Sequence, residues 1–195
     1  METSFFTKES CDYAGCYCEE NVYKLCEKFI KSQKSSEQEK GYAVFLTNPQ
    51  KQTYILYQQI GNPLNNNLVI WDYHVIFITK AKTSSFVYDL DSTLDFPIKF
   101  NEYYKKALGF SMKRRNRTFY RVCECEGFLK EFASDRSHML IDKEKGIYNN
   151  PIPKWPCIGM KETMNLEKYL DLGVDERRFG KVMNEDEFYD FFMNS

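Results

Sequence analysis

The stretch "LVIWDYHVIFIT" at residues 68–79 decides the fold of this 195-residue chain. It is rich in β-branched and aromatic residues, and apolar side chains occupy both of its alternating faces, as in a strand that is covered from two sides. We therefore predict that residues 68–79 form a central strand of a sheet. Asp72 and His74 interrupt the apolar run two positions apart, and residues at that spacing share one face of a strand.

Neighbouring segments of the same composition extend this strand into a sheet. They are "YAVFLT" (42–47), "TYILYQ" (53–58) and "SFVYDLD" (85–91). Turn-forming stretches such as "NPQK" and "GNPLNNN" separate them, a pattern that is typical of consecutive antiparallel strands. We predict a further strand at "TFYRVCEC" (118–125).

Helices are expected on both sides of this group of strands. Apolar residues from Val22 to Phe29 recur at i, i+3, i+4 and i+7, which predicts a helix over about residues 18–30. The polar "KSQKSSEQEKG" (31–41) then predicts a loop, and the proline-bearing "NNPIPKWPC" (149–157) predicts an extended surface segment. Shorter helices are predicted at "FNEYYKKALGF" (100–110), "EGFLKEFASD" (126–135), "NLEKYLDL" (165–172) and "NEDEFYDFF" (184–192). This order indicates an α+β fold with an antiparallel sheet flanked by helices, in a single domain over residues 1–195.

The composition excludes some classes of partner. The chain has 27 Lys and Arg against 28 Asp and Glu, so no net field attracts nucleic acid or an anionic membrane. We find neither a basic leader followed by an apolar run nor a membrane-length apolar segment. The cysteines are odd in number, seven in all, and scattered, which indicates reduced thiols in the cytoplasm or nucleus.

Cys18 is a candidate nucleophile because it begins the predicted helix. The N–H groups and dipole at a helix N-terminus favour a thiolate. Cys16 lies two residues upstream and outside the helix, whereas Cys26 falls on its apolar face, where burial keeps a thiol inert. A packed or bystander thiol at position 18 remains an open alternative.

His74 is a candidate base, although a hydrogen-bonded core histidine is the alternative. The next predicted strand carries Asp89 and Asp91, either of which could accept a ring N–H and fix the imidazole tautomer. They share a predicted strand face, so periodicity does not choose between them. A cysteine, a histidine and an aspartate on these elements are the components of a thiol acyl-transfer site.

A zinc site is the competing hypothesis for the cysteines. Cys11, Cys16 and Cys18 are spaced C-x4-C-x-C, and Cys123 and Cys125 are spaced C-x-C on one predicted strand. Neither spacing is the C-x2-C of zinc ribbons. A non-enzymatic zinc-binding module therefore stays as an alternative function.

Two further polar clusters have simple interpretations. The segment "ASDRSHM" (133–139) gathers Asp135, Arg136 and His138, and we expect a polar loop held together by its own contacts. The basic "KRRNR" (113–117) is expected to be a solvated face rather than a phosphate site, since the net charge of the chain is −1.

Several motifs together resemble one known family. "WDYHV" (71–75), "CYCEEN" (16–21), "YAVF" (42–45), "FVYDLD" (86–91) and "FASDRSHM" (132–139) are similar to those of the protein N-terminal glutamine amidohydrolase family, also called the WDYHV family. They occur in the order found in the family and cover the chain from about residue 11 to the last predicted helix. Phe179-Gly180 stands where some members have Trp-Gly.

The resemblance implies a fold, an activity and a set of site residues. It implies a papain-like or transglutaminase-like core with the nucleophile at a helix N-terminus, and hydrolysis of an N-terminal glutamine to glutamate through a thioester. The triad it implies is Cys18 as nucleophile, His74 as base and Asp89 as the residue that orients the histidine. No metal or organic cofactor is implied. Cysteine protease or transglutaminase-like acyl transfer is the alternative with the same triad.

Partners and context follow from the same resemblance. The implied substrates are proteins or peptides with a free N-terminal glutamine, and the glutamate product would then be arginylated in a degradation pathway. We expect a monomer that binds neither nucleic acid nor membrane. An enzyme that spares internal glutamine must recognise the free α-ammonium group, and a buried cation needs an anion beside it. Asp72 is the candidate carboxylate, because it is expected on the same strand face as His74.

Overall fold

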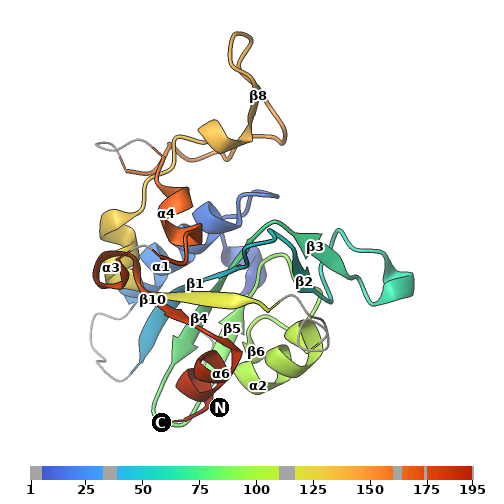
Figure 1. The fold of residues 1–195 in the computed structure, drawn as a ribbon, viewed down its shortest axis with the longest axis vertical. Helices are drawn as coiled ribbons and strands as arrows, with labels where there is room; N and C mark the ends of the chain where they lie inside the picture. Colours follow the sequence, from blue (N-terminus) through green and yellow to red (C-terminus); the bar gives the residue numbers. More distant parts are fainter. Residues whose placement is uncertain (1–5, 33–38, 110–116, 160–163, 174, 195) are drawn as a thin grey trace.

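A six-stranded sheet forms the centre of the computed structural model, which describes residues 6–32, 39–109, 117–159, 164–173 and 175–194. The strand order is β10-β7-β1-β4-β5-β6 (Figure 1), and every adjacent pair is antiparallel. The strands are β1 (Lys40–Thr47), β4 (His74–Lys80), β5 (Ser85–Tyr88), β6 (Ile98–Lys99), β7 (Phe119–Glu124) and β10 (Lys181–Met183). The predicted antiparallel sheet is thus confirmed.

Helices cover both faces of this sheet and divide the core into two parts. One face packs against α1 (Cys18–Ser32), α3 (Cys125–Glu131), α4 (Leu166–Leu170) and α5 (Glu176–Phe179). The other packs against α2 (Phe100–Tyr103), the π-helical turn Tyr104–Leu108 and α6 (Glu185–Met193). The α+β class is therefore confirmed, whereas the relation to papain-like and transglutaminase-like folds stays a prediction.

The central strand β1 shows why both faces had to be apolar. Ala43 and Phe45 point into the core under α1, and Val44 and Leu46 point into the core under α6. Because side chains alternate along a strand, the uninterrupted apolar run at residues 42–46 of β1 requires cover from both sides. Leu46 lies opposite His74 in the register of β1 and β4, so His74 begins its strand at one end of the sheet.

The predicted strand at 68–79 is wrong in one respect, because it is broken. Val69–Trp71 forms β3, which pairs with β2 (Thr53–Ile55) in a separate two-stranded sheet, and β4 begins only at His74. Between them the exposed Asp72 accepts the backbone N–H of Tyr73 at 3.0 Å. A side chain that bonds its neighbour's backbone competes with strand pairing, and the expected shared face of Asp72 and His74 does not exist.

The strand predicted at 53–58 stops at Ile55, and two more predicted strands also end earlier than expected. β5 ends at Tyr88, so Asp89 and Asp91 lie in the turn that follows it and not on one strand face. β7 ends at Glu124, and Cys125 begins α3, where its Sγ donates a hydrogen bond to Cys26 at 3.1 Å. In both places the chain turns away directly after its last paired strand residue. Side-chain periodicity within one strand does not reveal where the strand ends.

The predicted helices are present, and a few short elements were missed. The missed ones include the β8 (Leu140–Asp142) and β9 (Ile147–Tyr148) hairpin, which projects from one end of the molecule (Figure 1), and 3-10 turns at Lys8–Ser10, Pro63–Asn65 and Ser137–Met139. Residues 149–157 form neither helix nor strand, as predicted. Residues 33–38 of the predicted loop and 113–116 of the basic cluster lie outside the described residues. None of the described helices has both the length and the apolar character of a membrane span.

Phe188→Ala should destabilise the fold strongly. The Phe188 ring is fully buried and stacks on Tyr120 with ring centroids 3.9 Å apart, so its removal should lower the free energy of unfolding by about 3–5 kcal/mol. The measurement is urea unfolding followed by circular dichroism. Leu64→Ala, at a side chain that is 95% exposed, is the control and should cost less than about 0.5 kcal/mol. Equal losses in the two variants would contradict the packing described above.

Candidate active site

Cys18 is the first residue of α1, and a tight turn determines its position. The buried side chain of Asn21 accepts the backbone N–H of Ala14 and donates to its carbonyl oxygen, both at 2.9 Å. Cys16 adopts φ +66° in this turn, a conformation that is uncommon outside glycine. Cys16 therefore lies in the turn before α1, and Cys18 is the first residue of the helix, as the sequence predicted.

The environment of Cys18 keeps its thiol protonated. Burial, together with the carboxylates of Glu19 and Asp91, raises the pKa of Cys18 well above the ordinary value, against a hydrogen bond from the backbone of Val75. The helix N-terminus acts in the other direction, since its dipole favours a thiolate. The expected low pKa is therefore not found. A base beside the thiol is needed to make it a nucleophile.

His74 and Asp89 form a buried pair behind the cavity. His74 Nε2 lies 3.0 Å from Asp89 Oδ1, and both side chains are almost completely buried. Asp89 also accepts hydrogen bonds from Gln58 Nε2 at 3.0 Å, the Tyr103 hydroxyl at 2.8 Å and the Asp91 backbone N–H at 3.0 Å. Burial alone would raise the pKa of Asp89, but His74 and the bonds from Gln58 and Tyr103 lower it to about 2. Asp89 is therefore an ionised acceptor that holds the imidazole.

The orientation of the imidazole ring is set by an aromatic neighbour. Trp71 stacks on His74 with ring centroids 5.4 Å apart and an interplanar angle of 14°. The indole Nε1 of Trp71 donates to Gln58 Oε1 at 3.2 Å, and the amide nitrogen of Gln58 donates to Asp89. Gln58 thus ties the stacking residue to the orienting carboxylate, and the ring plane is fixed from two sides.

The second ring nitrogen of His74 is available to a reacting group. Nδ1 is buried and has no hydrogen-bond partner among the described residues. Because Nε2 faces the carboxylate of Asp89, the network assigns the ring proton to Nε2 and leaves a lone pair on Nδ1. Burial lowers the pKa of His74, but the charge and hydrogen bond of Asp89 outweigh it, so the net shift is upward. Such an imidazole can accept a proton and stabilise the charge it gains.

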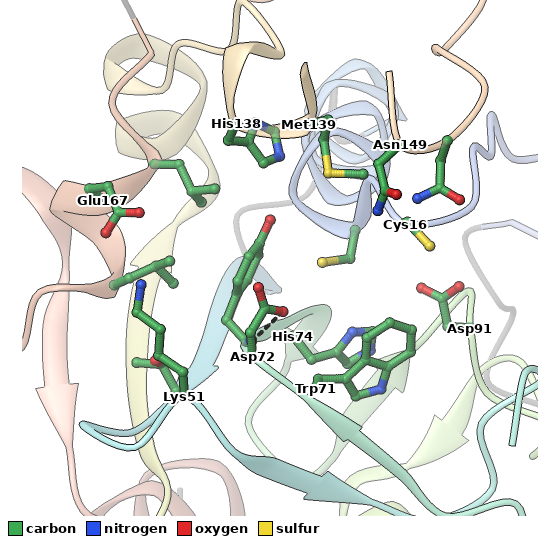
Figure 2. A pocket seen from close by; sticks show the side chains of 16 residues that line it. Cys16, Lys51, Trp71, Asp72, His74, Asp91, His138, Met139, Asn149 and Glu167 are labelled. Atoms are coloured by element: carbon green, nitrogen blue, oxygen red, sulfur yellow. Dashed lines mark hydrogen bonds between the residues drawn. The ribbon is translucent and has the colours of Figure 1, made fainter. Parts of the chain in front are cut away.

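Cys18 and His74 line the same cavity, which has a volume of about 330 Å³. Figure 2 shows His74 and Trp71 at its floor, Asp91 and Cys16 on one side, Asp72 on the other, and His138 on the opposite wall. The remaining lining residues are Thr47, Lys51, Tyr73, Met139, Asn149, Asn150, Leu166, Glu167 and Leu170. The cavity is open to solvent and is built from segments that lie far apart in the sequence.

The segment 133–139, whose His138 and Met139 line the cavity, is anchored to α1, which corrects the prediction of a polar loop that holds itself together. Arg136 donates to both oxygens of the buried Glu20, from Nε at 3.0 Å and from Nη2 at 2.9 Å. Ser134 and Trp155 donate to the same carboxylate at 2.8 and 2.7 Å. The segment also has local contacts, as predicted: Asp135 accepts the backbone N–H of Ser137, and the backbone N–H of Met139 donates to the carbonyl oxygen of Arg136. Glu20 therefore connects three separate segments beside the cavity.

Glu19 is a second buried carboxylate next to the thiol. It accepts the hydroxyl of Tyr73 at 3.0 Å, and His138 Nε2 lies 3.3 Å from its other oxygen. Cys18 Sγ lies 3.6 Å from the same carboxylate. These contacts bring His138, which the sequence left in a loop, to the wall of the cavity.

The predicted site residues differ in their position relative to the cavity. It brings Cys18 and His74 to one cavity with Asp89 directly behind His74, and Asp91, which periodicity could not separate from Asp89, lines the cavity itself. Asp72 also lines it but is exposed, and its contact with a substrate stays a prediction.

The cysteine zinc site finds no support in the geometry. Within the described part of the chain, the group of side chains that could hold a metal ion is His74, Asp89 and Asp91, whose ligand atoms lie within 4.8 Å of one another. It contains no cysteine. Each oxygen of Asp89 already accepts two hydrogen bonds from the protein, so an ion would have to displace them.

Sequence reasoning missed the residues that support the pair. Gln58 and Tyr103 lie 31 and 14 residues from Asp89, and no spacing rule connects them to it. Trp71 could have been found, because it stands three positions before His74 and is one of only two tryptophans in the chain.

Comparisons with known proteins agree on one family. Residues 13–192 match the family model described as N-terminal glutamine amidase. The chain is 40% identical to the protein N-terminal glutamine amidohydrolase of Danio rerio, over 93% of this chain and 89% of that protein. It is 37% identical to the protein of the same name from Caenorhabditis elegans, over 92% and 95%, and 38% identical to that of Bos taurus, over 93% and 86%.

The buried pair should make stability depend on pH. The folded-state pKa of Asp89 is depressed to about 2, so its contribution is present above its unfolded pKa of about 3.9 and is lost as the pH falls toward 2. The folded-state pKa of His74 is raised, so its contribution is complete below about pH 6.5 and is lost at higher pH. The pair should therefore stabilise the fold most between about pH 4 and 6.5.

Asp89→Asn tests this dependence by urea unfolding at pH 5.5 and at lower pH. The variant should be less stable than the wild type by about 2 kcal/mol at pH 5.5, and the difference should shrink toward pH 2. Asp95→Asn, at an exposed carboxylate, is the control and should stay within about 0.5 kcal/mol throughout. A difference that widens on acidification would mean that Asp89 is not ionised in the folded state.

Proposed function

Because this chain belongs to the N-terminal glutamine amidase family, we propose that it hydrolyses the side-chain amide of an N-terminal glutamine in proteins or peptides. The products are an N-terminal glutamate and ammonia. The reaction makes the protein a hydrolase of carbon–nitrogen bonds other than peptide bonds. The observation that supports the mechanism is Nδ1 of His74, which is buried and has no partner among the described residues, in a ring held by Asp89 and in a cavity shared with Cys18.

The first step in this proposal is activation of the thiol. Nδ1 of His74 accepts the proton of Cys18, and Asp89 stabilises the imidazolium that results. Since burial and neighbouring carboxylates raise the pKa of Cys18, the thiolate forms as the thiol attacks and is not stored beforehand. The stacking of Trp71 keeps the ring in place during this transfer.

Acylation and hydrolysis follow from the same three residues. The Cys18 sulfur attacks the carboxamide carbon, and the developing oxyanion is stabilised by backbone N–H groups at the start of α1, including that of Cys18. Each such donor is worth about 3 to 4 kcal/mol in measured cases. The imidazolium of His74 protonates the departing ammonia, which leaves a γ-glutamyl thioester. His74 then takes a proton from water as the water oxygen attacks the thioester carbon. The C–S bond breaks, glutamate leaves, and His74 returns the proton to the Cys18 sulfur.

The substrate end of the cavity must accept a free amino group. An α-ammonium enclosed without an anion would cost several kcal/mol, so a carboxylate beside it is required. Asp72 is the carboxylate proposed from the sequence, and it lines the cavity from its exposed position. The side chain of Asp91 lines the same cavity.

The proposal also includes the setting in which the protein acts. We propose a single domain over residues 1–195 that works as a monomer without a metal or organic cofactor, in the cytoplasm or nucleus. The seven cysteines are free thiols in the structure, which fits a reducing compartment. Arginylation of the product is a role implied by the family resemblance alone.

Substitution of the two neighbouring cysteines should have opposite outcomes. Cys18→Ala removes the proposed nucleophile and should abolish ammonia release while the circular dichroism spectrum is retained. Cys16→Ser is the matched control, because Cys16 precedes the helix and lines only the cavity wall, and it should keep most of the activity. The assay is ammonia release from a glutamine-first peptide. An inactive Cys16→Ser beside an active Cys18→Ser would identify the other thiol as the nucleophile.

Selectivity for the peptide terminus distinguishes the proposed deamidation from proteolysis and from transglutaminase-like transfer. Ammonia should be released from a peptide that begins with glutamine. It should not be released from a peptide of the same amino-acid composition in which glutamine stands at an internal position. Mass spectrometry of the products adds the second readout. Backbone cleavage would indicate a cysteine protease, and incorporation of an added amine would indicate a transglutaminase-like transfer; either result in place of deamidation would refute the proposed function.

A further inference from the structure

We infer that Asp91 holds the α-ammonium group of the substrate's first residue, and that it contributes more than Asp72 to the choice of a terminal glutamine. This inference rests on the proposed function, since it assigns a specificity residue to the same cavity. It starts from a carboxylate that is buried, faces the cavity and keeps an acceptor oxygen for a ligand.

Asp91 lies in the turn after β5 and is only 6% exposed, yet it lines the cavity. Figure 2 shows its carboxylate at the cavity wall beside Cys16, across from Asp72. The Tyr13 hydroxyl donates to Oδ1 at 2.6 Å, and for Oδ2 the described residues supply no further donor. A buried carboxylate with one unused oxygen is a site for a cation or a hydrogen-bond donor.

Asp89 differs from Asp91 although only one residue separates them. The two oxygens of Asp89 receive four hydrogen bonds from the protein, so Asp89 has no acceptor left for a substrate. Asp91 is also the carboxylate whose pKa is raised, first by burial and then by the charge of Asp89, against the attraction of His74. A bound cation would relieve both of these costs.

The distances suit an N-terminal glutamine. A carboxylate oxygen of Asp91 lies within 4.8 Å of a ring nitrogen of His74 and of an oxygen of Asp89. Four bonds separate the amino nitrogen of glutamine from its carboxamide carbon, a span of about 5 Å when extended, given bond lengths of about 1.5 Å. An ammonium bound to Asp91 therefore leaves the carboxamide within reach of His74, which lines the same cavity as Cys18. The charge of Asp91 already acts on the Cys18 thiol, whose pKa it helps to raise.

Asp72 is a weaker candidate on the same criteria. It is exposed, and its Oδ1 already accepts the backbone N–H of Tyr73. A charge pair in contact with water contributes a factor of about five or less in affinity, whereas loss of a desolvated pair costs roughly 30- to 5000-fold. Burial therefore favours Asp91 as the residue that distinguishes a free amino group from an internal peptide bond.

The test uses a pair of peptides that differ only in the amino group. One begins with glutamine, and its twin carries hydrogen in place of the α-amino group, so that the charge is removed without added bulk. Ammonia release gives kcat/KM for both peptides with wild type, Asp91→Asn and Asp72→Asn. Wild type should prefer the amino peptide by roughly 30-fold or more. Asp91→Asn should reduce this preference to a few-fold by slowing the amino peptide relative to the desamino peptide, and Asp72→Asn should retain it.

The outcomes separate this inference from the proposed function. If wild type releases no ammonia from the amino peptide, the proposed function fails. If wild type is active and Asp91→Asn keeps the wild-type preference, only the role of Asp91 is overturned. Loss of both rates in a folded Asp91→Asn would also overturn it, because Asp91 would then act in the chemistry. Asp91→Ser, judged by the same criteria, replaces the asparagine variant if circular dichroism shows that variant to be unfolded.

A metal ion is the competing occupant of Asp91 and is tested directly. Calorimetric titration of the wild type with Zn²⁺ should give no stoichiometric binding at the cavity. Stoichiometric binding that disappears in Asp91→Asn, with ammonia release that depends on the metal, would overturn the inference in favour of a metal site made of His74, Asp89 and Asp91.

Discussion

The buried contact between His74 Nε2 and Asp89 Oδ1, 3.0 Å long, is the interaction on which the rest of the site depends. An ionised carboxylate is stable in the interior only if donors surround it, and Gln58, Tyr103 and the backbone of Asp91 supply them. These donors come from three different segments of the chain. The fold must therefore be complete before the pair can form, and the pair leaves Nδ1 of His74 without a partner among the described residues.

The position of the thiol depends on a different set of contacts, those of α1. Cys18 begins α1, and the carboxylates of Glu19 and Glu20 follow it directly. Glu20 ties the helix to residues 134–136 and to Trp155, whereas Glu19 contacts the thiol itself and Tyr73. Burial, followed by the negative charge of Glu19 and Asp91, raises the pKa of Cys18. This arrangement suits a reaction in which the base and the substrate must both be present before the sulfur becomes nucleophilic.

The distribution of carboxylates also explains how one cavity could serve a cationic substrate and a thiolate mechanism. Both oxygens of Asp89 accept two hydrogen bonds, and Asp89 acts on His74, whereas Asp91 lines the cavity and accepts a side-chain hydrogen bond from Tyr13. Two aspartates that are two residues apart thus have different tasks, because the turn after β5 directs one behind the imidazole and the other beside the cavity. Their surroundings, and not their residue type, separate these tasks.

Local patterns in the sequence determined the helix that begins at Cys18 and the apolar strands β1 and β4. They also indicated that both faces of the sheet are covered, because side-chain periodicity reports directly which faces are buried. The motifs from "CYCEEN" to "FVYDLD" indicated the family and the candidate triad. Only the tertiary structure decided where strands stop: β3 pairs with β2 and not with the main sheet, and Gln58 and Gln59 hold the turn after Tyr88. The same holds for Gln58 and Tyr103 around Asp89 and for Arg136 on Glu20. These are pairings between distant residues, and a hydrogen bond between distant residues leaves no periodic signal in either partner's sequence.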